Sequence, residues 1–187
     1  MSNALAIAGV TAVIKDLLDS GMIDEAITDI LGAGVTVTSM APDTVSLDNN
    51  DSPQLNLFLH QVTPNVAWRN AALPSRDAGG NRVSNPPLAL DLHYLLTAYG
   101  RADLQAEVLL GYALQLLHET PVLPRDAIRR ALTPAVIDGA ILPTIYQSLR
   151  GADLAEQVEL LKVTPAALGT EEMSRLWSAL QARYRPT

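Results

Sequence analysis

The chain has 187 residues and a mass of 20.0 kDa, and its 48% hydrophobic and 18% charged residues are typical of a globular protein. It contains no cysteine, which excludes disulfides and thiolate metal sites. Its net charge of −7 argues against a non-specific nucleic-acid binder, which needs a basic surface.

The first predicted element is an amphipathic helix over residues 4–19. Its apolar side chains recur on one helical face, at Ile7, Val10, Ile14 and Leu17. We expect Ser20-Gly21 to end this helix. The apolar stretch 4–14 is too short to span a bilayer and has no basic residue before it, so neither a membrane span nor a signal peptide is expected.

A short helical turn over 23–31 and a strand over 35–40 are predicted next. Two stronger strands follow, at 55–62 and 88–98, in which apolar residues alternate with others along the chain. This alternation favours an antiparallel pair at the centre of the sheet. We expect its apolar face to be buried under a later helix through four leucines, Leu57, Leu59, Leu90 and Leu92.

The connection between these strands, residues 63–87, is unusually long and irregular for a compact domain. It contains four prolines, four asparagines and a Gly-Gly pair. It also contains Trp68 and three arginines, Arg69, Arg76 and Arg82, against one acid, Asp77. Because Trp and Arg are common anchors in protein interfaces, we predict that this loop docks on a partner. The alternative is a loose loop whose Trp68 folds back onto its own core.

The second half of the chain is predicted to be mainly helical. Asp103 is placed to cap a helix over 104–118, a basic helix follows over 125–132, and a short turn of helix lies at 145–149. A strand is predicted over 158–163. A last helix begins after Thr170 and buries one face, formed by Met173, Leu176, Trp177 and Leu180.

These elements predict an α+β fold with one mixed, mainly antiparallel sheet and helices packed on it. We expect a single domain over residues 1–187, from which the loop 63–87 extends.

Few residues suggest catalysis. His60, His93 and Asp91 could share one face of the two long strands and act as a base or bind a metal. The simpler interpretation is a polar sheet face whose groups bind each other or water, because nothing completes a metal set or a catalytic dyad. No nucleophile elbow, dinucleotide loop, phosphate loop or calcium loop is present, so no enzyme activity, cofactor or metal is expected.

The basic helix offers a second candidate surface. Arg125, Arg129 and Arg130 lie about one turn apart and could bind an acidic partner or a phosphate chain. The alternative is an ordinary solvated helix face.

Four segments, in a fixed order, resemble one known family. They are 55–70, LNLFLHQVTPNVAWRN; 86–100, PPLALDLHYLLTAYG; 116–123, LLHETPVL; and 162–180, which begins KVTP and ends EEMSRLWSAL. Together they resemble the tail-terminator, or cap, proteins of phage-tail-like contractile injection systems, the type found in the antifeeding prophage and the Photorhabdus virulence cassettes. The likeness extends over nearly the whole chain.

The resemblance implies a non-catalytic subunit of a six-membered ring. Such a ring sits on the last inner-tube ring, engages the last sheath layer, ends polymerisation and holds the sheath extended. Its implied partners are further copies of the chain, the inner-tube protein and the sheath protein, with no nucleic acid and no membrane insertion. Assembly is implied in the bacterial cytoplasm, with release by lysis where the particle acts outside the cell. Family members continue beyond the equivalent of Tyr184-Arg185-Pro186 into another strand, whereas this sequence ends at Thr187.

Two other classes stay open from the residues alone. One is a small hydrolase or ligand-binding domain that uses His60, His93 and Asp91, and the other is a nucleic-acid adaptor that uses the arginines. The acidic total disfavours the adaptor.

Overall fold

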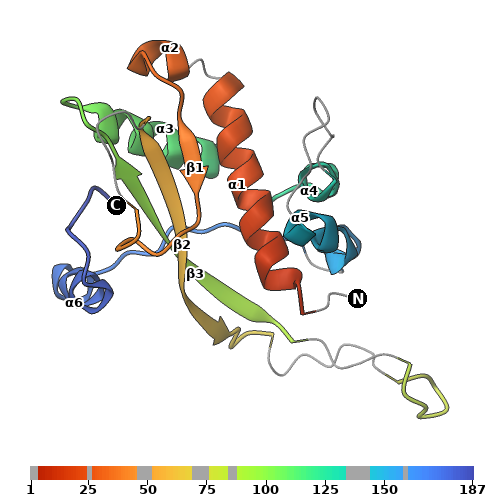
Figure 1. Ribbon diagram of the computed structural model, residues 1–187. Helices are drawn as coiled ribbons and strands as arrows, with labels where there is room; N and C mark the ends of the chain where they lie inside the picture. The colour runs from red at the N-terminus through yellow and green to blue at the C-terminus, as the bar shows by residue number, and fades with distance from the viewer. Residues whose placement is uncertain are drawn as a thin grey trace. The chain divides into compact units, whose positions relative to one another are not determined.

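The computed structural model describes residues 4–24, 27–45, 52–68, 76–83, 88–133, 144–157 and 160–187 (Figure 1). In chain order the elements are α1 (Ala6–Asp24), α2 (Ile27–Leu31), β1 (Thr36–Thr38), β2 (Gln54–Pro64), β3 (Leu90–Tyr99), α3 (Gln105–Glu119), α4 (Arg125–Leu132), α5 (Thr144–Leu149), the 3-10 turns η1 (Arg150–Ala152) and η2 (Leu154–Glu156), and α6 (Thr170–Leu180). The predicted α+β class is confirmed. Within the described residues, no helix is both long and apolar enough to cross a bilayer.

The chain packs as two compact units. The main unit comprises Met1–Phe58 and Leu95–Thr187, and the hairpin unit comprises Leu59–Tyr94. Each long strand contributes one part to each unit. The units are described separately below, and the single domain expected over 1–187 stays a prediction.

The sheet has the order β1-β2-β3 and is mixed. Strand β1 runs parallel to β2, and Val37 lies opposite Leu55. Strands β2 and β3 are neighbours that run in opposite directions, as their arrows in Figure 1 show. The predicted antiparallel pairing of the two long strands is therefore confirmed, and the short parallel strand adds the third member.

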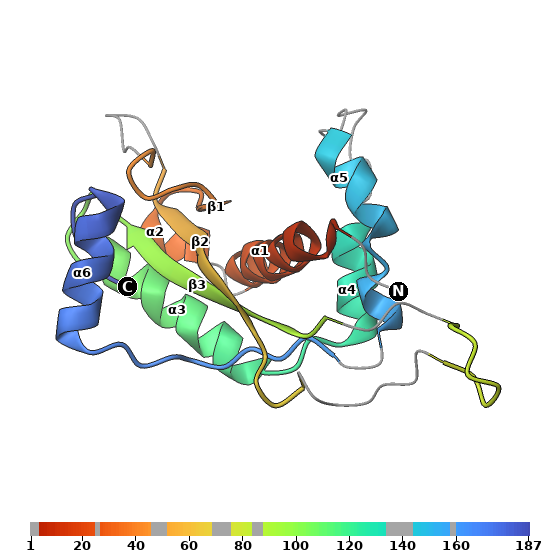
Figure 2. The same cartoon turned by 90° about the horizontal axis from the view of Figure 1, so that it is seen from below.

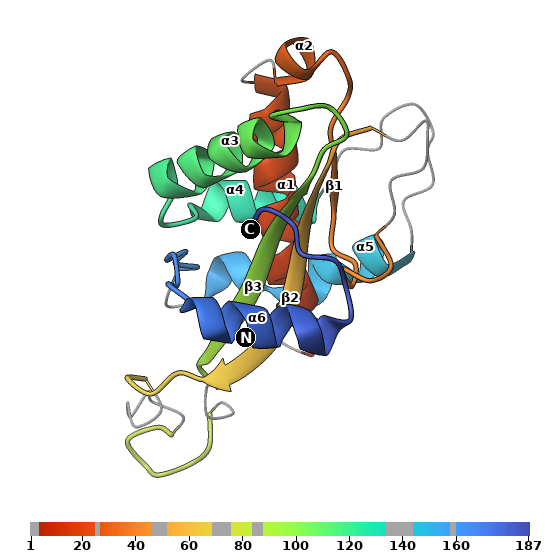
Figure 3. The same ribbon diagram turned by 90° about the vertical axis from the view of Figure 1, so that its left-hand side faces the viewer.

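Helices cover both faces of the sheet in the main unit. Helix α1 lies against one face and α6 lies against the other (Figures 2 and 3). Burial therefore does not alternate along the strands. In β2, Leu55, Asn56 and Leu57 are buried in succession, and in β3 burial is continuous from Thr97 to Tyr99.

The apolar core of the main unit joins elements from distant parts of the sequence. Its fully buried side chains, each 0% exposed, include Leu18, Ile27, Leu55, Leu109, Leu123 and Ile128. The four-leucine prediction is wrong for three members. Leu57 is buried, but Leu59, Leu90 and Leu92 are only half-buried, and all three belong to the hairpin unit.

One polar side chain is buried between the apolar residues of β2. Asn56 is fully buried on β2. Its Oδ1 accepts hydrogen bonds from the Thr38 hydroxyl at 2.9 Å and the Met40 amide at 3.0 Å, and its Nδ2 donates to the Met40 carbonyl at 3.0 Å. These bonds satisfy the buried amide and fix the segment after β1 against β2.

Helix α1 continues through the predicted stop at Ser20-Gly21 and ends at Asp24. A side chain at Gly21 would overlap the Leu116 side chain of α3, so the glycine permits the two helices to approach closely. The close contact with Leu116 therefore explains why position 21 is a glycine, and this glycine does not end the helix.

Two other predictions at the C-terminal end need correction. Residues 158–159 lie outside the described part, and over 160–163 the predicted strand is reduced to a single antiparallel bridge between Lys162 and Val122. Helix α6 buries Trp177, at 4% exposure, while Met173, Leu176 and Leu180 are only half-buried.

The segment after α6 returns to the sheet. The Trp177 and Tyr184 rings lie 5.5 Å apart, and the Arg185 guanidinium lies 5.6 Å from the centre of the Tyr99 ring. The Ala98 amide on β3 donates a hydrogen bond to the Pro186 carbonyl at 3.1 Å. The C-terminal segment is thereby attached along the outer edge of β3.

Candidate interaction surface

The hairpin unit exposes an unusual amount of apolar surface for its length. Its described residues include five exposed large apolar side chains, Val62, Val66, Trp68, Val83 and Leu88. Val66 is 76% exposed and Leu88 is 74% exposed. Apolar side chains gathered in one exposed segment are typical of protein interaction surfaces.

A compact turn shapes the described part of the loop at 76–83. The Asp77 carboxylate accepts hydrogen bonds from the Asn81 amide at 2.8 Å and side chain at 3.2 Å, and Gly80 takes a left-handed φ of 80°. The backbone bond of Asn81 holds the pKa of Asp77 below its ordinary value. Arg76 donates to the Gly80 carbonyl at 2.8 Å and pairs as a bridge with Arg82.

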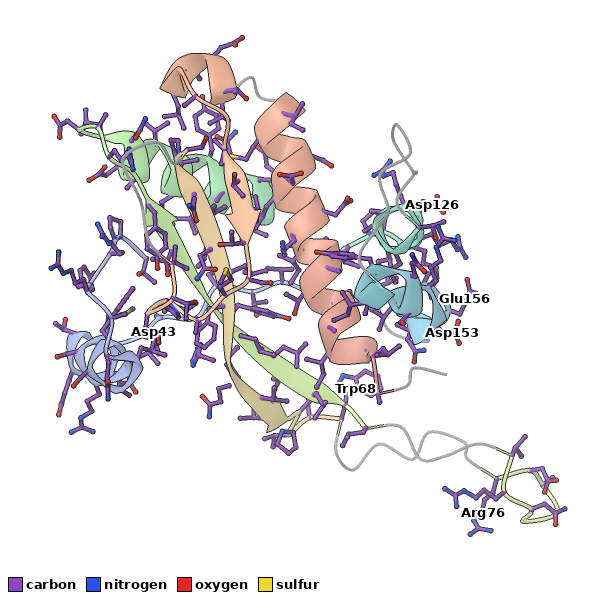
Figure 4. The ribbon with its side chains drawn as sticks, viewed as in Figure 1. Asp43, Trp68, Arg76, Asp126, Asp153 and Glu156 are labelled. Atoms are coloured by element: carbon purple, nitrogen blue, oxygen red, sulfur yellow. The ribbon has the colours of Figure 1, made fainter. Side chains whose placement is uncertain are left out.

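Hydrogen bonds between residues of the turn itself close it. Arg76, which belongs to the turn, is labelled in Figure 4. Because the loop tip is already structured, a partner that binds it has less conformational entropy to overcome. Arg69, the third predicted arginine, lies outside the described residues.

Trp68 is 38% exposed, and its amide donates to the Asn65 side chain at 2.9 Å. The indole is therefore partly available to a partner. The structure places Trp68, Arg76 and Arg82 on the same unit, and their role as docking residues stays a prediction.

The structure brings the predicted polar sheet face together within the hairpin unit. The His60 and His93 rings lie 6.2 Å apart. His93 Nε2 bonds with the Thr63 hydroxyl at 2.9 Å, and the Asp91 carboxylate accepts from the Asn65 side chain at 2.8 Å. Burial, and secondarily the charge of His93, lower the pKa of His60.

This arrangement is a hydrogen-bonded polar face. Asp91 is engaged by an asparagine, and no bond within the described hairpin joins it to either histidine. Among the residues described, no group of three or more His, Asp or Glu side chains is arranged to hold a metal ion.

The basic helix is α4, and its observed bounds, Arg125–Leu132, match the prediction. Arg125 donates to the Ala155 carbonyl at 3.2 Å and the Gln157 carbonyl at 3.0 Å. Arg129 pairs with Asp126 at 3.0 Å and with Glu156 at 2.7 Å, and both acids are labelled in Figure 4.

Two of the three predicted arginines of this helix therefore already have intramolecular partners. Arg130 is exposed, and its charge partly offsets the burial that raises the pKa of Asp16. The predicted contact of α4 with an acidic partner is not tested by this geometry and stays a prediction.

A groove that the sequence did not predict lies between α2 and the start of α3. It has a volume of about 210 Å³ and is lined mainly by apolar side chains, among them Ile30 and Leu104. The predicted Asp103 cap is wrong. Helix α3 begins at Gln105, whose Oε1 accepts from the amides of Arg101 at 2.9 Å and Ala102 at 3.1 Å.

Leu104 takes a left-handed backbone conformation, with φ 63°, and is 63% exposed. Both features are unfavourable for leucine. No sequence signal marks this residue, because a left-handed turn usually selects glycine or asparagine.

A family model described as the Pvc16 N-terminal domain matches residues 9–187. No curated protein matches the sequence.

A solved structure is also similar: the cryo-EM structure of an extracellular contractile injection system, PVC sheath/tube terminator in the extended state. It is 16% identical, with a TM-score of 0.47, over 88% of this chain and 51% of the terminator chain. The chain thus spans about half the length of that relative.

Proposed function

Because the chain belongs to the Pvc16 N-terminal domain family, we propose that it is the cap subunit that ends the tube and sheath of a contractile injection system. The family match over residues 9–187 carries this proposal. It confirms the resemblance recognised in the sequence, which covers nearly the same residues.

In this proposal the subunit forms a six-membered ring that seats on the last inner-tube ring, contacts the last sheath layer and stabilises the extended sheath. The role is structural and requires no cofactor. Assembly takes place in the bacterial cytoplasm as part of the particle, and lysis releases particles that act outside the cell.

The two units suit different parts of this role. The main unit has an apolar core drawn from many elements, so it can fold independently of a partner. The hairpin unit exposes apolar side chains and carries three arginines against two acids, Asp77 and Asp91. Both acids accept hydrogen bonds from asparagines of the same unit, and by composition the arginines outnumber the acids.

Two measurements test the proposed function. Light scattering coupled to size exclusion should give a ring-sized species for the full chain, alone or with its tube protein. A strictly monomeric chain under both conditions would contradict the ring.

The second measurement uses particles. Cells that lack this chain should assemble sheaths of uncontrolled length or sheaths that contract prematurely. Particles of normal length that stay extended would show that the chain is not the terminator.

A further inference from the structure

We propose that the groove between α2 and α3 receives the hairpin unit of a neighbouring copy of this chain. This contact would be the head-to-tail joint by which copies associate. The inference rests on the proposed function, because it names a partner for the docking loop, but it concerns contacts between copies and can fail by itself.

The groove has the apolar character of a receptor. Ile30 on α2 is 57% exposed and Leu104 before α3 is 63% exposed, and both line it. The two helices lie beside each other at this end of the main unit (Figures 1 and 3). Together the two exposed side chains and the groove form an apolar surface whose burial by a partner is favourable.

The backbone turn that contains Leu104 is closed by specific hydrogen bonds. The two bonds to the Gln105 side chain close the turn from Arg101 to Gln105, and Leu104 is its left-handed residue. A glycine would relieve the backbone strain, yet an exposed leucine occupies the position. Strain that is retained at an exposed apolar residue indicates a binding role, because folding alone gains nothing from it.

The acidic side chains near the groove indicate that it binds a basic surface. Asp29 lies on α2 beside Ile30, and Asp103 lines the groove. The receptor is therefore apolar and acidic.

The hairpin unit has the complementary character. Val66, Val83 and Leu88 are exposed apolar side chains, and Arg76 and Arg82 lie on the compact turn. An apolar, basic arm and an apolar, acidic groove on one chain make a heterologous pair of surfaces. Such pairs join copies head to tail, and they close into a ring when the rotation permits.

The absence of cysteine from the natural sequence allows a direct test. Val83→Cys marks the arm, at a residue that is 68% exposed, and Ile30→Cys marks the groove. Ile145→Cys is a matched control, because Ile145 is 58% exposed against 57% for Ile30 but lies on α5. All three positions are exposed, so the full-length variants should fold.

Equal amounts of two single-cysteine variants are mixed, oxidised and run on non-reducing gels. The arm and groove variants should form a two-chain species about tenfold more abundant than the arm and control variants form, because docking raises the effective thiol concentration. Equal yields, no cross-link in either mixture, or efficient cross-linking of Val83→Cys with itself would overturn the proposal.

The double variant Val83→Cys/Ile30→Cys should give a ladder that ends at the ring. A disulfide within one chain, seen as a monomer with altered mobility, would contradict a contact between copies. Arg82→Glu should weaken association measured by sedimentation about tenfold, and Asp29→Lys in the partner should restore it. Loss in Arg82→Glu without restoration would refute the charge pairing.

Particle length separates this inference from the proposed function. If variants that fail to cross-link still cap particles of normal length, the joint is wrong and the terminator role stands. If the joint forms but particles are uncapped, the terminator role fails and the joint stands.

Discussion

The same strand behaves differently in the two units of the molecule. In the main unit, β3 is buried on both faces, and Leu95, Thr97, Ala98 and Tyr99 are each no more than 3% exposed. In the hairpin unit, Leu90 and Leu92 are only half-buried, and Leu88 before the strand is 74% exposed. The residue types are similar in both places. Layers of helices, rather than local sequence, determine which part becomes core.

The two units therefore have different roles, since the main unit provides stability and the hairpin unit provides surface for interaction. The main unit contains the side chains whose removal should unfold the protein. The hairpin unit keeps apolar and basic groups at the surface, where they cost little to alter in the isolated subunit. The predictions below test that division through matched substitutions.

The largest expected effect comes from comparing a buried leucine of β3 in the main unit with an exposed leucine just before β3 in the hairpin unit. Leu95→Ala should lower the free energy of unfolding by about 2–5 kcal/mol, because it leaves a cavity in the core. Leu88→Ala should change it by less than about 0.5 kcal/mol. Urea unfolding measures both, and a costly Leu88→Ala would mean that the hairpin unit is part of the core.

A smaller effect is expected at the contact between α1 and α3. Gly21→Ala should destabilise the protein by about 1–3 kcal/mol, because the added carbon overlaps Leu116. The control is Gly111→Ala on α3, where nothing lies within 4 Å of the added carbon. That change should stabilise the fold by about 0.5–1 kcal/mol through helix propensity. If the thermal midpoints of the two variants shift alike, the close approach of the helices is wrong.

A third comparison concerns two arginines of α4, one with internal hydrogen-bond partners and one on the exposed face. Arg125→Ala removes the donor from two carbonyls, those of Ala155 and Gln157, and should cost about 1 kcal/mol. Arg130→Ala, on the exposed face of the same helix, should stay within about 0.5 kcal/mol of the parent. The same denaturation assay applies, and equal costs would remove the structural role assigned to Arg125.

The smallest effect concerns pH and the hairpin unit alone. Burial lowers the pKa of folded His60 below its value of about 6.5 in an unfolded chain. Above that pH His60 is neutral in both states, so it contributes no difference. As the pH falls below it, the unfolded hairpin binds the proton first, and the folded hairpin loses stability.

Hydrogen exchange, corrected for the intrinsic rate at each pH, measures this loss. Protection of the hairpin amides should decrease on acidification, and His60→Gln should reduce that decrease. Since His60 is half-buried, the change should be small. A His60 ring that titrates above the unfolded value would reverse the assignment.

Local patterns in the sequence predicted much of the fold. The basic helix was predicted with its observed bounds, and the long strands were predicted to within two residues at each end. These elements have strong local signals, namely helical spacing and strand alternation bounded by proline. The Gly21 prediction failed because the decisive contact, with Leu116, comes from a distant segment.

The candidate surfaces were only partly predictable. Composition and length singled out the loop at 63–87 and its arginines. The groove was not predictable, because it requires α2 and the turn before α3 to meet, and nothing local marks Leu104 as left-handed. The partners of Arg125 and the Glu156 partner of Arg129 were also hidden, since they lie about thirty residues away along the chain.

Deletion of residues 72–84 tests the central claim, that the hairpin unit docks while the main unit folds, most directly. A short turn can join the same two strands, so the isolated subunit should keep its thermal midpoint within a few degrees. Particles assembled with this variant should lose length control or contract prematurely. A subunit that unfolds would place the loop in the core, and particles of normal length that stay extended would show that the loop is a passive insertion.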